Sequence, residues 1–483
     1  MYLPPLSPED EVISTWQHRQ SLLRGRIGLI DADIVCFQEV SPLSFEQDFA
    51  FMTEDLGYDG VELFRKGRFR PATFWKKDRV ELVTPAQHKD RTMLTTFRII
   101  DEHVNTSHGN ELAAEEKQSQ NTITVDESHV YQLENPPENK KSKANKNKKG
   151  GSKETPQNVD YWHVLNCHLQ AGKQGGRRVR QIVDGVTAAV KLAKKLEESD
   201  PTNIKLVVCG DFNGGSECGA VRYLESGKIG PDFLEDGEQV SSKEKLLPLA
   251  SPLIDAYSFD RDGGSPPATL VVAELISLLI DQGSIETCYI NPLFSEDVMD
   301  RFGRIYKSLA TVSTAGAPSN EMQMGVADVE AWLTSINKQF GRGSEFRNAA
   351  KYMGWVEPTL ESEDSGEEAC KMNKNTLNKK AERPPIIIPD DGILTFNDFI
   401  GVYLDELRQG KFWGIAWDLA RLGEPLPIED VFKGRYDRMY CSASLSPVAV
   451  LDTISEVPCP NKSEPSDHLP VASTFQHVVS NQL

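Results

Sequence analysis

The feature of this sequence that most constrains its fold is a short apolar run that ends in polar residues. Residues 206–209 are all apolar, and the next four are Gly210, Asp211, Phe212 and Asn213. An uninterrupted run of this length favours a strand that is buried on both faces. Because alternate side chains of an extended chain point the same way, Asp211 and Asn213 are expected to lie side by side at a sheet rim. A carboxylate there can orient or deprotonate water, and an amide can hydrogen-bond a phosphoryl oxygen; an Asx turn is the plain alternative.

The composition is that of an ordinary globular protein. The 483 residues are enough for two or three domains, or for one large domain with insertions. A net charge of −19 argues against a broadly basic nucleic-acid surface, but it does not exclude a nuclease, because a bound divalent cation supplies local positive charge. The eight cysteines form no CxxC pair, which argues against zinc-ribbon and thioredoxin-like sites and favours a reducing intracellular compartment, cytoplasmic or nuclear. No segment reaches the length of a membrane span.

Several other segments carry polar side chains at or near the end of a strand-like run. These side chains are Glu39, Asn166, His168, Asp437, Asp467 and His468. Glu39 ends a run at 32–40 that is expected to be a buried strand, and Asn166 and His168 share one face of the run at 161–169. A carboxylate at the end of a core strand costs free energy unless it is paired or bound to a metal. For each residue taken alone, a hydrogen-bonded structural role is the plain alternative.

Two insertions interrupt the strands. Residues 101–160 are polar and lack periodicity, with a lysine cluster in their later part, which is typical of a disordered insertion. A nucleic-acid-binding role or a nuclear signal stays open for these lysines. Residues 258–429 contain amphipathic stripes and are expected to form a helical domain. The α/β part would then consist of residues 1–257 and 430–483.

A segment in the second insertion resembles the loop of a degenerate EF hand. If Gly392 is loop position six, Asp391 and Asp398 take positions five and twelve and become the candidate calcium ligands. Positions one and three are then Ile387 and Pro389, which offer no side-chain oxygen. Calcium binding and a packing module that kept the shape of the hand both stay open.

Together, the strand-end motifs resemble those of the endonuclease/exonuclease/phosphatase superfamily. The matching stretches are Gln38-Glu39-Val40, Asn166-Cys167-His168-Leu169, Gly210-Asp211-Phe212-Asn213, Tyr436-Asp437-Arg438-Met439-Tyr440 and Ser466-Asp467-His468. They follow the family's order and leave out both insertions. The resemblance implies a four-layered α/β sandwich with two facing, mostly antiparallel sheets. The EF-hand-like segment is similar, more loosely, to a plant-type calcium-binding branch of the same superfamily.

The resemblance also implies a metal site. Glu39 would ligate a catalytic Mg²⁺ or Mn²⁺, with Asp467 nearby as a second ligand or a water contact, and oxygen ligands of this kind suit either ion. One departure bears on this site. The family begins with a strand ending in an Asn that joins the metal shell, whereas no Asn precedes Asn105 here. We therefore expect the first strand of one sheet to be missing and the activity of this chain to be weak.

The remaining motif residues take catalytic roles by the same resemblance. Asp211 would position or deprotonate the attacking water, and His468, held by Asp437, would stabilise the phosphoryl charge. The side chains expected to contact the scissile phosphate are Asn166, His168 and Asn213.

These features predict a Mg²⁺-dependent phosphodiesterase or nuclease with an inserted EF-hand-like domain. The stretches 16–39 and 71–75 are similar to the deadenylase-related branch, which favours RNA as substrate, while inositol phosphates, sphingomyelin and abasic DNA stay open. The alternative from another class is a catalytically inactive scaffold that binds a protein partner through its helical insertion. The complete 211/213 and 467/468 pairs favour the enzyme, because a scaffold needs no such set.

Overall fold

The computed structural model describes most of the chain outside residues 101–159 and 357–385. The described residues are 12–41, 43–62, 70–100, 160–196, 203–258, 265–283, 291–313, 322–338, 340–341, 343–356, 386 and 388–478. The predicted lysine-rich insertion therefore lies outside the described residues apart from Asp160, and so does Ile387, the first position of the EF-hand-like loop.

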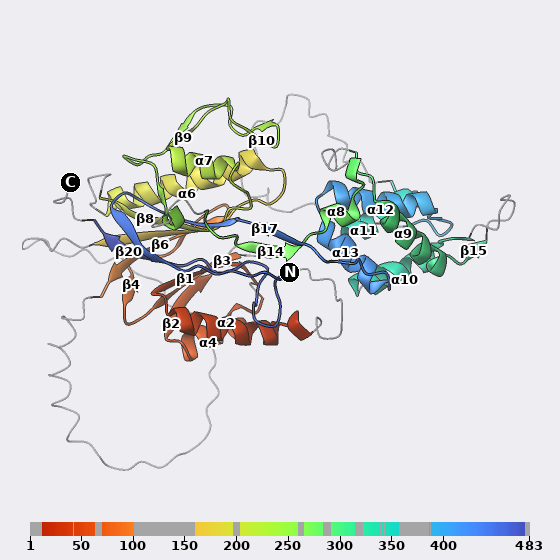
Figure 1. Ribbon diagram of the computed structural model, residues 1–483, viewed down its shortest axis with the longest axis horizontal. Coiled ribbons are helices and arrows are strands. Elements are labelled where there is room, and N and C mark those ends of the chain that lie inside the picture. Colours follow the sequence, from red (N-terminus) through yellow and green to blue (C-terminus); the bar gives the residue numbers. More distant parts are fainter. Residues whose placement is uncertain are drawn as a thin grey trace, which may run out of the picture.

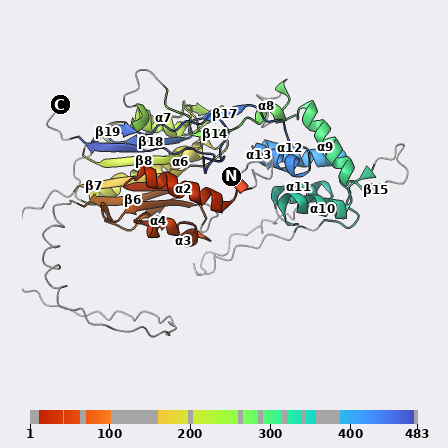
Figure 2. The same ribbon diagram turned by 60° about the horizontal axis from the view of Figure 1, so that its bottom comes forward.

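Four layers stack in the α/β part of the chain (Figures 1 and 2). Two helices cover the outer face of a large sheet, namely α6 (Gly175–Lys195) and α7 (Gly219–Ser226). A smaller sheet lies against its inner face, and three helices cover the far side of that smaller sheet, namely α2 (Trp16–Ile30), α3 (Phe45–Asp48) and α4 (Ala50–Glu54). Separate apolar clusters fill the spaces between these layers. The layered α/β sandwich is the fold that the motifs predict.

The large sheet has the strand order β13-β18-β8-β7-β6-β4, with β5 also paired to β6. Its strands are β4 (Val80–Leu82), β5 (Gln87–Lys89), β6 (Thr92–Ile99), β7 (Tyr161–His168), β8 (Lys205–Asp211), β13 (Ile254–Asp255) and β18 (Asp437–Cys441). Among the described strands of this sheet, only β7 and β8 run parallel, and α6 forms the crossover between them. Every residue of β8 is buried, because helices cover one face of this central strand and the smaller sheet covers the other.

The smaller sheet has three described strands in the order β1-β3-β2. They are β1 (Ile34–Val40), β2 (Tyr58–Glu62) and β3 (Arg70–Lys76), and both pairings are antiparallel. The sequence predicts a buried strand at 32–40, but Val40 is the one buried residue of β1. The reason is that β1 is an edge strand of this sheet as described, so one of its sides has no strand neighbour.

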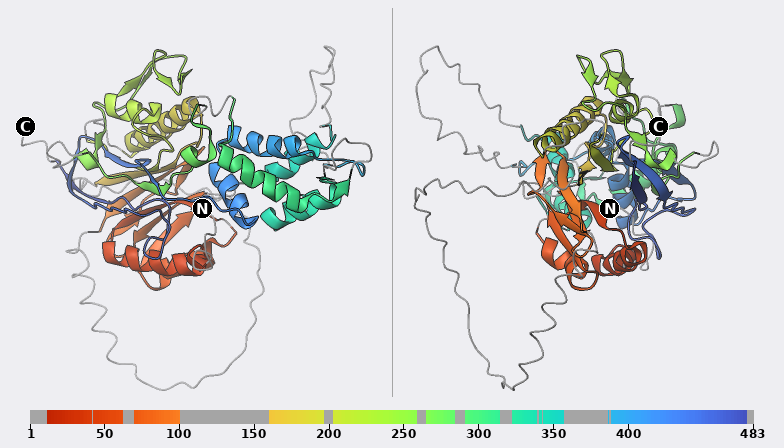
Figure 3. Two further views of the ribbon diagram at one scale, coloured as in Figure 1. Left: turned by 45° about the vertical axis from the view of Figure 1, so that its right-hand side comes forward. Right: turned by 90° about the vertical axis from the view of Figure 1, so that its left-hand side faces the viewer.

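A helical unit with its own core lies beyond one end of the sandwich, as Figure 1 and the left view of Figure 3 show. The core residues of this unit fall within 275–428. Its elements are α8 (Ile276–Leu279), α9 (Glu296–Leu309), β15 (Val312–Ser313), β16 (Met322–Gln323), α10 (Val326–Asn337), α11 (Gly343–Tyr352), α12 (Phe396–Arg408) and α13 (Phe412–Arg421). The rings of Phe302, Trp332, Phe399 and Tyr403 pack together at its centre. The amphipathic stripes predicted from the sequence are therefore the buried faces of α9, α10 and α12.

A two-stranded ribbon connects the helical unit to the sandwich (Figure 1). It consists of β14 (Leu270–Ala273) and β17 (Val431–Gly434), paired antiparallel along their full length. The remaining elements are the hairpin of β19 (Leu445–Val450) with β20 (Ser473–His477), the short 3₁₀ helix η2 (Ala256–Ser258), and the small pairs β9 (Lys228–Ile229) with β12 (Lys245–Leu246) and β10 (Leu234–Glu235) with β11 (Glu238–Gln239). Among the described residues, no helix combines the length and apolarity that crossing a bilayer requires.

Candidate functional site

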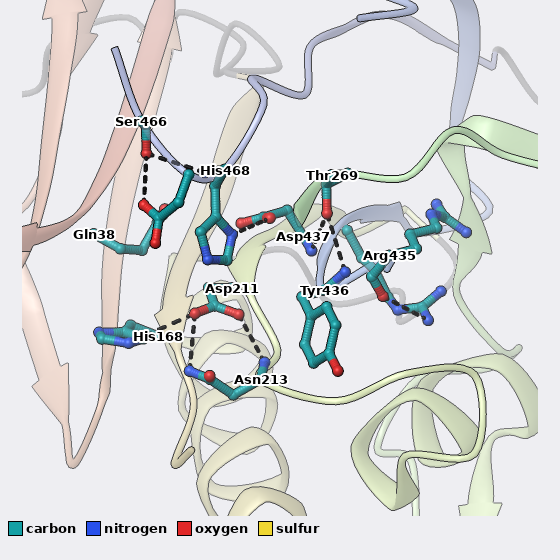
Figure 4. Close-up of polar contacts among 12 residues, drawn as sticks. Gln38, His168, Asp211, Asn213, Thr269, Arg435, Tyr436, Asp437, Ser466 and His468 are labelled. Carbon is teal, nitrogen blue, oxygen red and sulfur yellow. Dashed lines mark hydrogen bonds and ion pairs between the residues drawn. The ribbon is translucent and has the colours of Figure 1, made fainter. Parts of the chain in front are cut away.

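Three neighbouring strands of the large sheet place polar side chains at the same end of the strands. In the register of the sheet His168 lies opposite Asp211, and Asp211 lies opposite Asp437. The parallel strands β7 and β8 finish at this end, and the antiparallel strand β18 begins there. Figure 4 shows the side chain of Asp211 near that of His468, which comes from the last motif of the chain, and a dashed line joining Asp211 to His168. The topology therefore brings together residues that are far apart in the sequence.

Asp211 and Asn213 are held against each other by hydrogen bonds. The backbone N–H of Asn213 donates to Oδ1 of Asp211 (2.7 Å), and its Nδ2 donates to Oδ2 of Asp211 (2.8 Å) and to the carbonyl of Leu169 (2.9 Å). Asn213 has φ 49°, a left-handed conformation that asparagine adopts more readily than most residues. The Asx turn and the adjacent carboxylate and amide that the sequence offers as alternatives are thus one arrangement.

His468 and Asp437 form the second pair of the site. Nδ1 of His468 lies 2.6 Å from Oδ2 of the buried Asp437, and the backbone N–H of His468 donates to Oγ of Ser466 (3.2 Å). The hydroxyl of Thr269 accepts hydrogen bonds from the backbone N–H of Asp437 (2.8 Å) and from the backbone N–H of Tyr436 (3.0 Å). Thr269 cannot be recognised from the sequence, because a single threonine before an apolar strand has no distinguishing pattern.

The two pairs are close enough to act on one ligand. One carboxylate oxygen each of Asp211 and Asp437 and one ring nitrogen of His468 lie within 4.8 Å of one another. In the described part of the chain, this is the one group of three or more His, Cys, Asp or Glu side chains with a spacing that can hold a metal ion. Nε2 of His168 adds a further nitrogen 3.6 Å from Oδ2 of Asp211.

Burial and neighbouring charges shift the pKa values of these groups apart. Burial, helped by the charge of Asp437, raises the pKa of Asp211 to about 7. Burial, together with Arg91 and His468, lowers the pKa of His168 to about 4. Burial also acts to lower the pKa of His468, but the charge of Asp437 and its hydrogen bond outweigh it, with Asp211 and Asp467 adding to them, so this pKa lies well above its ordinary value. At neutral pH the site therefore holds a charged His468, a neutral His168 and an Asp211 that can gain or lose a proton.

The two predicted magnesium ligands, Glu39 and Asp467, lie outside this cluster. Glu39 has φ 56° at the register shift of β1, and its side chain is 55% exposed, with Oε1 3.8 Å from Nε2 of His168. The guanidinium of Arg19 lies near both acids: burial lowers the pKa of Arg19, while the charges of Asp467 and Glu39 act in the opposite direction. Nε of Arg19 also donates to the carbonyl of Pro465. Arg19 is a site residue that the sequence analysis does not identify.

Asn166 takes a structural position that does not fit the predicted substrate contact. It is fully buried, and its Nδ2 donates to the carbonyls of Ala72 (2.9 Å) and Phe37 (3.1 Å) on the smaller sheet. Its Oδ1 accepts from Nε2 of Gln38 (2.9 Å). The amide therefore ties the two sheets together. The reason is the register: Asn166 lies opposite Cys209, two residues short of the edge that His168 reaches.

The two predicted calcium ligands belong to no group of three or more candidate metal-binding side chains among the described residues. Oδ2 of Asp398 accepts the backbone N–H (3.1 Å) and the hydroxyl (2.6 Å) of Thr395, while the Thr395 hydroxyl accepts the N–H of Asp398 (3.2 Å). This is a capping box at the start of α12. Asp391 is exposed. The loop that contains it does pair with a second loop, because Leu394 and Met324 exchange both backbone hydrogen bonds.

Comparisons with known proteins give distant relatives. The chain is 24% identical over 285 residues to 2',5'-phosphodiesterase 12 of Mus musculus, and these residues are 58% of this chain and 42% of the relative. The chain thus spans less than half the length of this curated relative. Similar solved structures include ANGEL2, a 2',3'-cyclic phosphatase, in complex with adenosine-2',3'-vanadate (14% identity, TM-score 0.41, 96% of this chain and 87% of that chain) and the human Nocturnin catalytic domain with bound sulfate anion (16%, 0.30, 53% and 72%). At these TM-scores the structural likeness carries no argument.

A family comparison covers far more of the chain. The model described as the Endonuclease/Exonuclease/phosphatase family matches residues 13–468. The match begins just before α2 and ends at His468, so it includes every motif of the site. On this evidence the chain belongs to the endonuclease/exonuclease/phosphatase family.

Proposed function

We propose that this protein is a Mg²⁺-dependent phosphodiesterase that acts on nucleic acid, with RNA as the first candidate substrate. The observation that carries the proposal is the convergence of the Asp211–Asn213 pair and the Asp437–His468 pair at one sheet edge. Membership of the family supports it, and the name of the murine relative, a 2',5'-phosphodiesterase, agrees with it.

In the proposed mechanism Asp211 activates the attacking water. Its raised pKa of about 7 suits a general base that works near neutrality, because the carboxylate then holds a transferred proton without being fully protonated beforehand. Asn213 fixes the orientation of the carboxylate through both of its oxygens. His168 is uncharged at neutral pH and hydrogen-bonds the scissile phosphate without repelling a metal ion.

His468 supplies the positive charge that the reaction needs. The buried carboxylate of Asp437 keeps the imidazole oriented and protonated, so it can stabilise the negative charge that develops on the phosphoryl oxygens. This pairing resembles the role of a buried carboxylate beside a catalytic histidine in other hydrolases.

The residues proposed to hold Mg²⁺ are Glu39 and Asp467. The charges of both carboxylates act on the same cationic side chain, that of Arg19, and this supports a shared role for the two acids. Hard oxygen ligands of this kind fit Mg²⁺ or Mn²⁺. A bound ion would neutralise phosphoryl oxygens beside His468. Arg19 adds fixed positive charge to that space.

A substrate panel tests this proposal. Poly(A), single-stranded DNA, abasic DNA, sphingomyelin and inositol phosphates would be incubated with the full chain and Mg²⁺, with and without a chelator. We expect hydrolysis of poly(A) that is lost in Asp211→Ala and in His468→Ala and kept in Asp232→Ala, an exposed carboxylate away from the site. Activity on inositol phosphates or sphingomyelin alone would overturn the substrate class. Activity that both site variants retain would overturn the site.

For the helical unit we propose a packing or partner-binding module that keeps the pairing of two EF-hand-like loops without their calcium. The Met324–Leu394 bridge supports the paired loops. The capping role of Asp398 and the lack of a side-chain oxygen on Pro389 at position three speak against the metal. A protein partner of this unit is a further proposal. A pull-down with the full chain should retain the partner, and a variant with residues 275–428 exchanged for a short linker should lose it.

A further inference from the structure

Thr269 joins three segments at the root of the ribbon. It directly precedes β14 and is 2% exposed. Its backbone N–H donates to the carbonyl of Gly434 (2.9 Å), and its carbonyl accepts the N–H of Leu469 (2.6 Å). Its hydroxyl accepts the N–H groups of Tyr436 (3.0 Å) and Asp437 (2.8 Å), as the dashed lines in Figure 4 show. One buried residue therefore contacts the end of β17, the start of β18 and the segment after His468.

The hydroxyl of Thr269 fixes the peptide that carries the Asp437 carboxylate. Two successive N–H groups donate to it, that of the part-buried Tyr436 and that of the buried Asp437, and a buried N–H without an acceptor costs free energy. On its other side the same peptide is held because the carbonyl of Tyr436 accepts the N–H of Phe212, next to Asp211. With both sides of this peptide fixed, the backbone of Asp437 is held where its carboxylate reaches Nδ1 of His468.

The residues that follow Thr269 hold the other half of the pair. Leu270 forms an antiparallel bridge with His468, and the N–H of Val271 donates to the carbonyl of Asp467 (3.2 Å). The start of the ribbon, residues 269–271, is thus hydrogen-bonded both to the strand that carries Asp437 and to the loop that carries His468. The far end of the same ribbon enters the helical unit.

We propose that Thr269 is a positioning residue for the Asp437–His468 pair and the point where the ribbon of the helical unit is joined to the site. It acts through its hydroxyl acceptor and touches no substrate. Its effect on turnover rests on the phosphodiesterase activity proposed above, whereas its effect on the backbone of Asp437 does not.

Two substitutions separate the hydroxyl from the volume of the side chain. Thr269→Val is nearly isosteric but removes the acceptor, and Thr269→Ser keeps it. We expect Thr269→Val to lower kcat about 10-fold to 100-fold with KM within about 2-fold, because a misplaced catalytic pair weakens the transition state more than substrate binding. We expect Thr269→Ser to recover kcat to within about 3-fold of wild type. Thr95→Val, a buried threonine of β6 in the same sheet, is the matched control and keeps wild-type kcat.

A double-mutant cycle separates positioning from a general loss of structure. In an Asp437→Asn background, Thr269→Val should lower kcat by less than about 2-fold, because the pair that it positions is already disrupted. A loss as large as in the wild-type background would show that Thr269 acts elsewhere and would overturn the proposal.

The proposal can also be tested by a measurement that does not depend on catalytic activity. Amide hydrogen exchange, followed by NMR on the full chain, should show protected N–H groups at Tyr436 and Asp437 in wild type and in Thr269→Ser. In Thr269→Val both should exchange at least about 10-fold faster, while Arg438 in the middle of the strand is unchanged. Unchanged exchange in Thr269→Val would overturn the proposal even if the protein hydrolyses RNA. An inactive wild type with the expected exchange pattern would overturn the proposed function alone.

Discussion

At the scale of single residues, the site depends on a buried carboxyl whose proton affinity is set by its surroundings. Asp211 lies at the end of a fully buried strand, and its pKa is raised to about 7 by burial and by Asp437. The Asn213 N–H acts in the opposite direction, because it stabilises the ionised form. The same residues that make Asp211 a suitable base therefore also set the pH at which it works.

The pH dependence of the rate follows from this raised pKa. Asp211 is a base only when it is deprotonated, so kcat/KM should increase as pH rises through about 7. His168, with a pKa of about 4, contributes no step above about pH 5. The measurement is kcat/KM for poly(A) at saturating Mg²⁺ from about pH 5 to about pH 9. A flat profile through pH 7 would argue against Asp211 as the base.

Asn213 allows the roles of its amide and its backbone to be measured separately. Asn213→Gly keeps the left-handed φ without strain and removes the amide, so we expect about 100-fold lower kcat with nearly unchanged stability. Asn213→Ala should lose as much activity and also about 1 kcal/mol of unfolding free energy, because alanine is strained at φ 49°. Steady-state kinetics and urea unfolding of both variants check this. Wild-type activity in Asn213→Gly would exclude a role for the amide.

At the scale of elements, the helical unit buries two carboxyl groups at the packing of α12 with α13. Asp418 is 7% exposed, and burial, with the charge of Glu345, raises its pKa well above the ordinary value. Glu406 is 2% exposed, and burial likewise raises its pKa, although Lys411 acts in the opposite direction. A carboxyl group that prefers its protonated form when folded stabilises the fold less as pH rises.

The raised pKa of Asp418 in the folded chain predicts how this residue affects stability. Above the ordinary carboxyl pKa the unfolded chain releases the proton that folded Asp418 retains, so the unfolding free energy falls as pH rises from about 4. Asp418→Asn removes this dependence. The unfolding free energy of the variant, relative to that of wild type, should therefore be higher at pH 8 than at pH 5. Urea unfolding at both pH values measures the difference, with the exposed Asp391→Asn as control. An equal effect of Asp418→Asn at both pH values would contradict the assignment.

A second prediction at this scale concerns calcium binding by the loop before α12. Because the Asp398 carboxylate is occupied by the N–H and hydroxyl of Thr395, calcium at about 1 mM should give no saturable heat in a titration of the full chain. Thr395→Ala should cost about 1 kcal/mol of unfolding free energy through loss of the cap. Saturable calcium binding that Asp398→Ala abolishes would contradict the packing role.

At the scale of the whole molecule, the sequence predicts those parts of the site that carry local patterns. The apolar run before Asp211 marks the end of a strand, and the family resemblance supplies the order of the motifs. The Asp467-His468 dipeptide lies in a loop before β20 and at no strand end. Arg19 has no such pattern, because its partner Pro465 is 446 positions away in the chain. Thr269 is missed for the same reason, since its hydroxyl acts on a strand 168 positions later.

Where the sequence analysis assigns a wrong environment, three-dimensional neighbours are the cause. Asn166 and His168 are two residues apart on the same face of β7. The smaller sheet covers Asn166, however, and only His168 lies at the end of the strand, in the site. Residues 34–40 are apolar enough for a central strand, but their sheet places them at an edge. The sequence pattern shows the strand and its faces, and the neighbours decide which face is covered.

The central claim is that Asp211 at this sheet edge drives phosphodiester hydrolysis. The most direct test is the single-turnover rate of poly(A) hydrolysis by wild type and by Asp211→Asn, an isosteric change that removes the base, at equal Mg²⁺ and protein concentrations. We predict a loss of about 10³-fold in the variant with the fold intact by circular dichroism. An Asp211→Asn protein that hydrolyses the substrate as fast as wild type would contradict the account.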